Sequence, residues 1–340
     1  MNFELLKLVS NTPGIPGFED AIQDVVAEVL GKSCDSIKRD RMGNVIALKK
    51  AARTPAGAKR PLRVVLAAHA DEVGAMVEHI NPEGYLRFQQ VGRLAAASIT
   101  SQPVVVHGRK QVLGAIVPHR DKVLEVEDLM IDVGLPYQEV CKLVEVGDAI
   151  TFPHEVVQIN DKVVMGRNFD DRIGTYTLLE TMRRLGETSV DVYAVSSVQE
   201  ELGVRGMWTA AYAIEPDIGI AIDGSPCRGP YSESNKTTDM GLGTGIYLMD
   251  RLTIGDRRLV AFLLKICETH SIPHQRNIGG GTDASAIQRS RSGALATTVG
   301  APVRYMHSTV QLCHDDDLEA TIRLLTIFLE HAHDLLQVDE

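Results

Sequence analysis

The segment LRVVLAAHADEVG, residues 62–74, decides the fold and contains the first candidate functional residues. Apart from Arg63, residues 62–68 are all apolar. A short run of this kind is typical of a strand that is buried on both faces of a sheet. His69 and Asp71 follow directly, and a spacing of two places both side chains on the same side of an extended chain. The segment therefore predicts a central strand that ends in a pair of polar residues.

The rest of the chain repeats this pattern. Further strand-like apolar runs lie at residues 44–48, 190–196 and 218–222. Helical patterns lie at residues 21–30, 173–185, 204–213 and 317–336. Strands that alternate with helices indicate an α/β domain whose sheet is mixed but largely parallel and is flanked by helices.

The middle of the chain differs from its two ends. Between residues 84 and 152, short β-like pieces are separated by Gly, Pro and charged turns, which is typical of a small β-rich module. The α/β pattern resumes near residue 163, and candidate site residues lie on both sides of the interruption. We therefore predict a body formed by residues 1–72 and 163–340, with residues 73–162 as an inserted β-rich domain.

Composition excludes several classes of function. The 340-residue chain has a formal net charge of -10 and no run rich in Lys or Arg, so we expect no nucleic-acid partner. No segment approaches the roughly 18 apolar residues of a membrane span, and the N-terminus does not resemble a signal peptide, so we expect no membrane partner. The five cysteines form no CxxC pair, which favours a reducing, cytoplasmic location over a disulfide framework or a thiolate metal site.

Two pairs of residues are candidates for a metal site: a histidine with an aspartate, and two adjacent aspartates. A histidine near a carboxylate, such as His69 with Asp71, is a common metal-ligand arrangement, although both residues could also be plain surface or capping residues at a strand end. Asp170 and Asp171 open a helical pattern in GRNFDDRIG. They could cap that helix and interact with its dipole. In a metal site, Asp170 would instead lie between two cations, supported by Asp171 or Arg172.

Other candidates lie where later strands are expected to end. Glu200 and Glu201 follow the run at 190–196, at the end of a strand where open α/β sheets place their ligands. Adjacent carboxylates repel, so burying both needs a cation or a raised pKa; otherwise they form an exposed acidic turn. Asp223 ends the run at 218–222, where a turn-forming role is the alternative. His307 lies inside a short β-like run, VRYMHSTVQ, and could be a purely structural histidine.

No single motif of this series decides the function, but the set is coherent. Two histidines, two aspartates and one glutamate offer imidazole and carboxylate ligands without thiolates. That combination suits Zn, Co or Mn. A glutamate beside such a site could deprotonate a water.

The ordered set of motifs resembles the M42 family of metallo-aminopeptidases, the tetrahedral (TET) or glutamyl aminopeptidase-like group. The resemblance covers nearly the whole chain and includes the opening PGIPGFE and the inserted VEDLMIDVG and VGDAITF. The motifs around the candidate site are AHADEVG, NFDDRIG, QEELGVRG, IDGSP, GGGTDA and YMHS. The resemblance implies a body of the zinc-peptidase type with an inserted dimerisation domain.

The resemblance also implies a ligand set for two divalent metal ions, with Zn expected and Co or Mn as alternatives. Asp170 would bridge the two ions. His69 and Glu201 would complete the site of one ion. Asp223 and His307 would complete the site of the other.

Two further residues have implied roles in catalysis. Glu200 would be the general base, and Asp71 would orient the His69 ring. The GGGTDA loop, residues 279–284, would lie beside the substrate. Arg276, Arg304 and Lys236 are candidate pocket cations, with a surface position as the alternative. Dimers would assemble into a homo-oligomer, a hollow tetrahedral dodecamer.

The function implied is removal of N-terminal residues from short peptides by metal-activated water. A di-zinc deacylase or carboxypeptidase of the same superfamily would use nearly the same ligands. A scaffold that assembles without turnover is a further alternative, although all five ligands and the base are present. A glycan hydrolase would need two carboxylates and no metal. Sensitivity of the activity to a chelator separates the metal-dependent functions from the scaffold and the glycan hydrolase.

Overall fold

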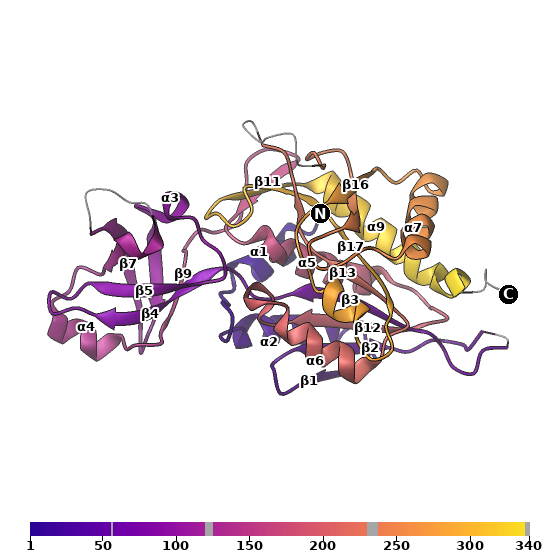
Figure 1. Cartoon of the computed structure of the whole chain (residues 1–340), viewed down its shortest axis with the longest axis horizontal. Coiled ribbons are helices and arrows are strands. Elements are labelled where there is room, and N and C mark those ends of the chain that lie inside the picture. Colours follow the sequence, from indigo (N-terminus) through magenta and orange to yellow (C-terminus); the bar gives the residue numbers. More distant parts are fainter. Residues whose placement is uncertain (56, 120–124, 230–236, 337–340) are drawn as a thin grey trace.

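The computed structural model describes residues 1–55, 57–119, 125–229 and 237–336. It consists of an α/β body and a separate β barrel that lies at the left of Figure 1. The barrel is inserted in the chain after the third strand of the body. The expected α/β fold with a small β-rich domain is confirmed.

The centre of the body is an eight-stranded sheet with the order β1-β2-β12-β3-β13-β17-β15-β16. Its bounds are β1 Ser36–Arg39, β2 Val45–Lys49, β3 Arg63–His69, β12 Asp191–Ser197, β13 Ile218–Ile222, β15 Thr244–Met249, β16 His274–Ile278 and β17 Leu295–Gly300. The central strands β12, β3, β13 and β17 run parallel to one another, whereas β1, β2 and the β15–β17 pair introduce antiparallel contacts. The sheet is therefore mixed, with a parallel centre.

Helices cover both faces of this sheet (Figure 1). The helices on one face are α1 Phe3–Asn11, α2 Asp20–Leu30, α5 Phe169–Arg184, α7 Arg257–Thr269 and α9 Asp315–His331; those on the other face are α6 Arg205–Ile214 and α8 Ala284–Gln288. Strand β3 shows why a central strand of this sheet is apolar on both of its faces. Val64 and Leu66 pack into the larger core, whereas Val65 and Ala67 pack under α6 and α8.

Helix boundaries differ slightly from the sequence-based expectation at the end of the chain. The regular helix α9 ends at His331, and a 3-10 segment, η3 Ala332–Leu336, replaces its expected last turn. No helix in the described part of the chain is long and apolar enough to cross a membrane.

A second, five-stranded sheet lies beside the first. Its strands are β10 Val157–Gln158, β11 Val163–Gly166, β14 Ser225–Pro226, β18 Pro302–Arg304 and β19 Gln311–His314, in the order β10-β11-β19-β18-β14. The chain thus joins a sheet of the body again at β10, shortly after it leaves the barrel.

The inserted barrel is closed by six strands in the order β4-β5-β8-β7-β6-β9. These strands are β4 Gly74–Ile80, β5 Leu86–Val91, β6 Pro103–His107, β7 Gln111–Pro118, β8 Leu129–Asp132 and β9 Ala149–Thr151, and the short helices α3 Ala96–Ile99, η1 Val126–Asp128 and α4 Tyr137–Leu143 connect them. The barrel has its own apolar core, which includes Leu86, Val104 and Ile131.

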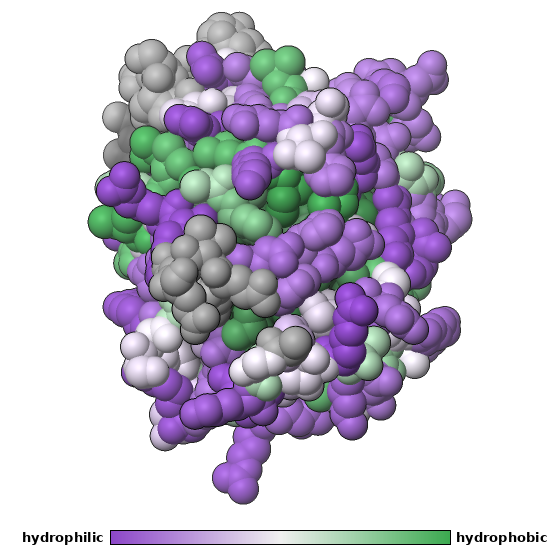
Figure 2. Space-filling model, turned by 90° about the vertical axis from the view of Figure 1, so that its right-hand side faces the viewer, coloured by the Kyte–Doolittle hydropathy of each residue, from purple (hydrophilic) through white to green (hydrophobic). Residues whose placement is uncertain are grey.

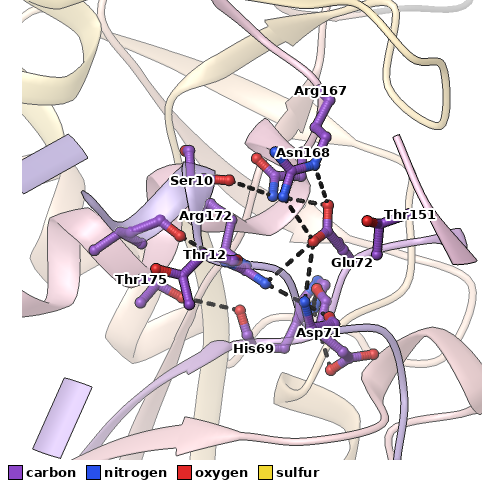
Figure 3. Close-up of polar contacts among 12 residues, drawn as sticks. Ser10, Thr12, His69, Asp71, Glu72, Thr151, Arg167, Asn168, Arg172 and Thr175 are labelled. Atoms are coloured by element: carbon purple, nitrogen blue, oxygen red, sulfur yellow. Dashed lines mark hydrogen bonds and ion pairs between the residues drawn. The ribbon is translucent and has the colours of Figure 1, made fainter. Parts of the chain in front are cut away.

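A buried ion-pair network joins the body to the start of the barrel (Figure 3). Glu72, which lies between β3 and β4, is 2% exposed. Its carboxylate accepts hydrogen bonds from Arg167 Nε at 2.8 Å, Asn168 Nδ2 at 2.9 Å and the amide of Gly14 at 3.1 Å, and Arg172 lies 3.6 Å away. Burial alone would raise the pKa of Glu72, but the charges of Arg167 and Arg172 hold it below its ordinary value.

Candidate metal and peptidase site

The candidate site lies at the carboxyl ends of the central parallel strands. His69 is the last residue of β3, and Asp223 follows the last residue of β13. Glu200 and Glu201 form the short 3-10 turn η2 Glu200–Leu202, just beyond β12. The carboxyl ends of neighbouring parallel strands meet at one edge of a sheet, so three separate segments deliver their polar side chains to one place.

Asp170 is central to this group. His69 Nε2 lies 3.3 Å from Asp170 Oδ1, and His307 Nε2 lies 3.1 Å from Asp170 Oδ2. The two oxygens of one carboxylate therefore each face a different histidine. Asp170 and Asp171 have non-helical backbone angles at the start of α5, and the Asp170 amide donates to Gln311 Oε1 at 2.8 Å.

His307 reaches the site by a route that differs from the expectation. The expected β-like run around it is wrong: β18 ends at Arg304, β19 begins at Gln311, and His307 lies in the intervening loop with a φ of 58°. Its Nδ1 lies 3.0 Å from the backbone oxygen of Arg93, which follows the barrel strand β5. The loop brings the ring to the Asp170 oxygen that His69 does not contact.

Asp71 contacts both the histidine and the paired glutamates. Its carboxylate is fully buried and accepts hydrogen bonds from the amides of Glu200 and Glu201, each at 3.0 Å. His69 Nδ1 lies 3.1 Å from the backbone oxygen of Asp71 and 3.5 Å from its Oδ1. Asp71 thus holds the turn that carries the two glutamates, in addition to lying beside the His69 ring.

The acidic side chains of the site repel one another in the absence of a cation. Burial raises the pKa of Glu201 to about 7, with Asp170 as a further cause, and burial also raises the pKa of Asp223 well above its ordinary value. The pKa of Asp170 stays low despite burial, because His307 and His69 donate to it. Hydrogen bonding to Asp170 raises the pKa of His307 to about 9. A cluster of this kind is a candidate functional site.

Two sets of potential ligand atoms lie close enough to hold a cation. His69, Asp170 and Glu201 form one set, and His69, Asp171 and Asp223 form the other; the ligand atoms within each set lie within 4.8 Å of one another. Glu201 Oε1 and Asp171 Oδ1 are buried without a hydrogen-bond partner. Buried carboxylate oxygens without partners are costly, and a divalent cation would satisfy them. The residues therefore fit a metal site.

A cavity of about 900 Å³ opens onto this cluster. It brings together residues of the body, including Glu200, Asp223 and His307, and residues from the barrel side such as Arg93 and Glu125. Its lining residues in the described part of the chain include two arginines, Arg93 and Arg251, but neither Arg276 nor Arg304. Lys236, the third expected pocket cation, lies outside the described residues.

The structure adds Asp283, which sequence reasoning placed only within the GGGTDA loop. Asp283 is 3% exposed, its Oδ2 accepts a hydrogen bond from Ser197 Oγ, and its Oδ1 is buried without a partner. Burial raises the pKa of Asp283 to about 6. The only signal in the sequence was an acidic residue within a run of glycines.

Comparisons with known proteins identify the family of the chain. A model of the M42 glutamyl aminopeptidase family matches residues 43–324. The lysyl aminopeptidase of Pyrococcus furiosus is 31% identical over 347 residues, which cover 97% of this chain and 97% of that protein. An aminopeptidase from the archaeon Desulfurococcus kamchatkensis has a TM-score of 0.93 and 33% identity, with 99% of this chain and 97% of that chain covered. The TET1 peptidase of Pyrococcus horikoshii, described as assembling into a tetrahedron or a large octahedral shell, has a TM-score of 0.85 and 31% identity, with 96% and 98% covered.

An α/β body with buried acidic and histidine residues at the carboxyl edge of its sheet, combined with these matches, defines a peptidase. The chain belongs to the M42 family and is an aminopeptidase of that family.

Proposed function

We propose that the chain removes N-terminal residues from short peptides with the help of two divalent cations, for which Zn, Co and Mn are the candidates. The cations would be held by His69, Asp170, Glu201, Asp223 and His307. The observation that carries this proposal is the cluster itself, in which Glu201 Oε1 and Asp171 Oδ1 are buried without partners and the pKa values of Glu201 and Asp223 are raised. Bound there, the cations would lower the pKa of a water and polarise the scissile carbonyl.

The geometry supports one arrangement of the ligands. Asp170 turns one oxygen to His69 and the other to His307, which favours a position between the two cations. Asp223 groups with His69, and Glu201 groups with His69 and Asp170. If Asp223 completes the site that includes His69, Glu201 is the carboxylate that remains beside Asp170 for the cation at His307. We therefore propose that Asp223 shares a cation with His69 and Glu201 shares one with His307, which exchanges the two outer carboxylates relative to the expectation from the sequence.

Glu200 is the proposed general base. It lines the cavity beside the cluster, and burial raises its pKa well above the ordinary value, with Asp283 and Asp223 as further causes. A carboxylate whose pKa is raised can take a proton from water and deliver it to the departing amine. Asp71 would act through the backbone, because it binds the amide of Glu200 as well as that of Glu201.

The assembly state is a further part of the proposal. The TET1 relative can assemble into a tetrahedron or a large octahedral shell. We propose that this chain also forms a homo-oligomer, built from dimers that contact through the barrel, with a tetrahedral dodecamer as the expected product. Figure 2 shows the end of the molecule opposite the barrel, where a band of hydrophobic residues crosses an otherwise mostly hydrophilic surface. Contiguous apolar surface of this kind commonly marks contacts between proteins.

A substrate panel tests the proposed activity. The purified protein is incubated with a free-amine tetrapeptide, with its N-acetylated form and with an acyl-amino acid, each with and without a chelator. We expect stepwise removal of residues from the free-amine peptide only, and its loss on chelation. Cleavage of the acetylated peptide from its carboxyl end, or of the acyl-amino acid, would instead assign a carboxypeptidase or a deacylase.

A further inference from the structure

The turn that carries Glu200 and Glu201 is held in place by side chains from distant segments. Beyond β12, the chain passes through Gln199, which has a φ of 56°, into the single 3-10 turn Glu200–Leu202. A non-glycine residue with a left-handed backbone is strained and persists only where the surroundings enforce it. Something outside the turn must therefore define its conformation.

Four successive backbone amides of this segment donate to buried side chains. Val198 N–H donates to Asn44 Oδ1 at 3.0 Å, and Gln199 N–H donates to Glu19 Oε1 at 3.1 Å. The next two amides, of Glu200 and Glu201, donate to the Asp71 carboxylate. The acceptors belong to three separate segments, at residues 19, 44 and 71. Each amide in the row is thus fixed in direction by a side chain.

Glu19 has the features of a residue dedicated to this contact. It is 6% exposed, and its Oε2 accepts a second hydrogen bond from the amide of Gly17 at 2.8 Å. Within the described residues, no lysine or arginine forms an ion pair with it. A buried carboxylate is costly even with the more distant charge of Arg172 acting on it, and the packing of α2 alone would not require one. Glu19 belongs to the opening motif PGIPGFE, for which the candidate site provides no other use.

We propose that Glu19 is a positioning residue for the aminopeptidase reaction, acting through the amide of Gln199 to set the direction of the Glu200 side chain. The inference rests on the proposed function, in which Glu200 is the general base. Glu19 does not line the cavity, so it affects the alignment of the reacting groups and not the affinity for the peptide. A displacement of about 1 Å in a catalytic group can lower a rate by about 100-fold.

Two substitutions separate position from charge. Glu19→Asp keeps the charge but shortens the side chain by one methylene, so the carboxylate no longer reaches both amides. Glu19→Gln removes the charge but keeps an oxygen that can accept from Gln199 N–H. We expect kcat to fall by about 10- to 100-fold in E19D and to stay within about fivefold in E19Q, with KM within about twofold in both. Asp20→Asn is the matched control, because Asp20 is the exposed neighbour on the same helix and should leave kcat unchanged.

Metal content and thermal unfolding are measured for every variant beside kcat and KM. The proposal is overturned if E19D retains the wild-type kcat, if E19Q loses as much activity as E19D, or if the loss in E19D merely follows a loss of metal or of folded protein. Failure of the proposed function gives a different result, because the wild-type protein would then cleave no free-amine peptide at all.

Discussion

Replacing Glu200 by Gln tests the proposed base with little disturbance of the structure. Glutamine has the same shape as glutamate. The backbone amide of residue 200, which lies 3.0 Å from Asp71 Oδ1 in this structure, would still donate to it. Glu201 and the other proposed ligands are untouched, so metal binding should persist. Loss of a general base lowers a rate by about 10²- to 10⁴-fold, which corresponds to about 3–5 kcal/mol in activation free energy. We expect that loss in kcat, with a smaller change in KM.

The same variant should be no less stable than the wild type. In the metal-free protein, Glu200 lies among other acidic groups, and Asp283 and Asp223 contribute to its raised pKa. A neutral amide removes that repulsion. The assay follows release of the N-terminal residue from a free-amine peptide, together with metal content and thermal unfolding. Glu125→Gln removes a carboxylate from the same cavity and serves as the control. A kcat of E200Q within tenfold of the wild type would refute the assignment.

Three further predictions concern metal binding, stability and pH. Asp170→Asn should reduce bound metal, measured by elemental analysis, and abolish turnover; full metal content would contradict its place between the cations. Glu72→Ala should lower the free energy of unfolding by about 3–5 kcal/mol in urea, since it leaves buried arginines unpaired, and a change below 1 kcal/mol would contradict the role of that network. In the metal-free protein, Glu201 titrates near pH 7 when folded against an ordinary pKa of 4.5, so the folded state binds more protons between these values. The contribution of Glu201 to the free energy of unfolding should therefore fall as pH rises from 4.5 to 7. Calorimetry should show this fall, and added metal should reduce it.

Local patterns in the sequence were sufficient for the architecture. The apolar runs at β3 and β13 could only be buried on both faces, and the change to short β-like pieces marked the barrel. Polar residues directly after those strands were expected to meet because the strands are parallel. For that reason His69, Glu201 and Asp223 could be expected near one another from their places after the strands, whereas their roles as ligands were implied by the family resemblance and stay a prediction.

Features that depend on distant contacts could not be predicted in this way. His307 is held by a loop whose partner, the backbone oxygen of Arg93, is 214 residues away, so the local pattern wrongly indicated a strand. Asp283 meets Ser197 across 86 residues, and Glu19 meets Gln199 across 180. Hydrogen bonds from side chains to remote backbone amides leave no periodic signal in a sequence. The supporting residues of the site therefore emerge only from the structure.

The most direct test of the two-cation aminopeptidase is a metal titration of stripped protein. Chelator-treated protein is titrated with Zn²⁺, Co²⁺ or Mn²⁺, while bound metal and release of the first residue from a free-amine peptide are measured together. We predict no turnover before metal is added, and activity that reaches its maximum as two equivalents bind. Full activity of the stripped protein, or saturation of both binding and activity at one equivalent, would contradict the account.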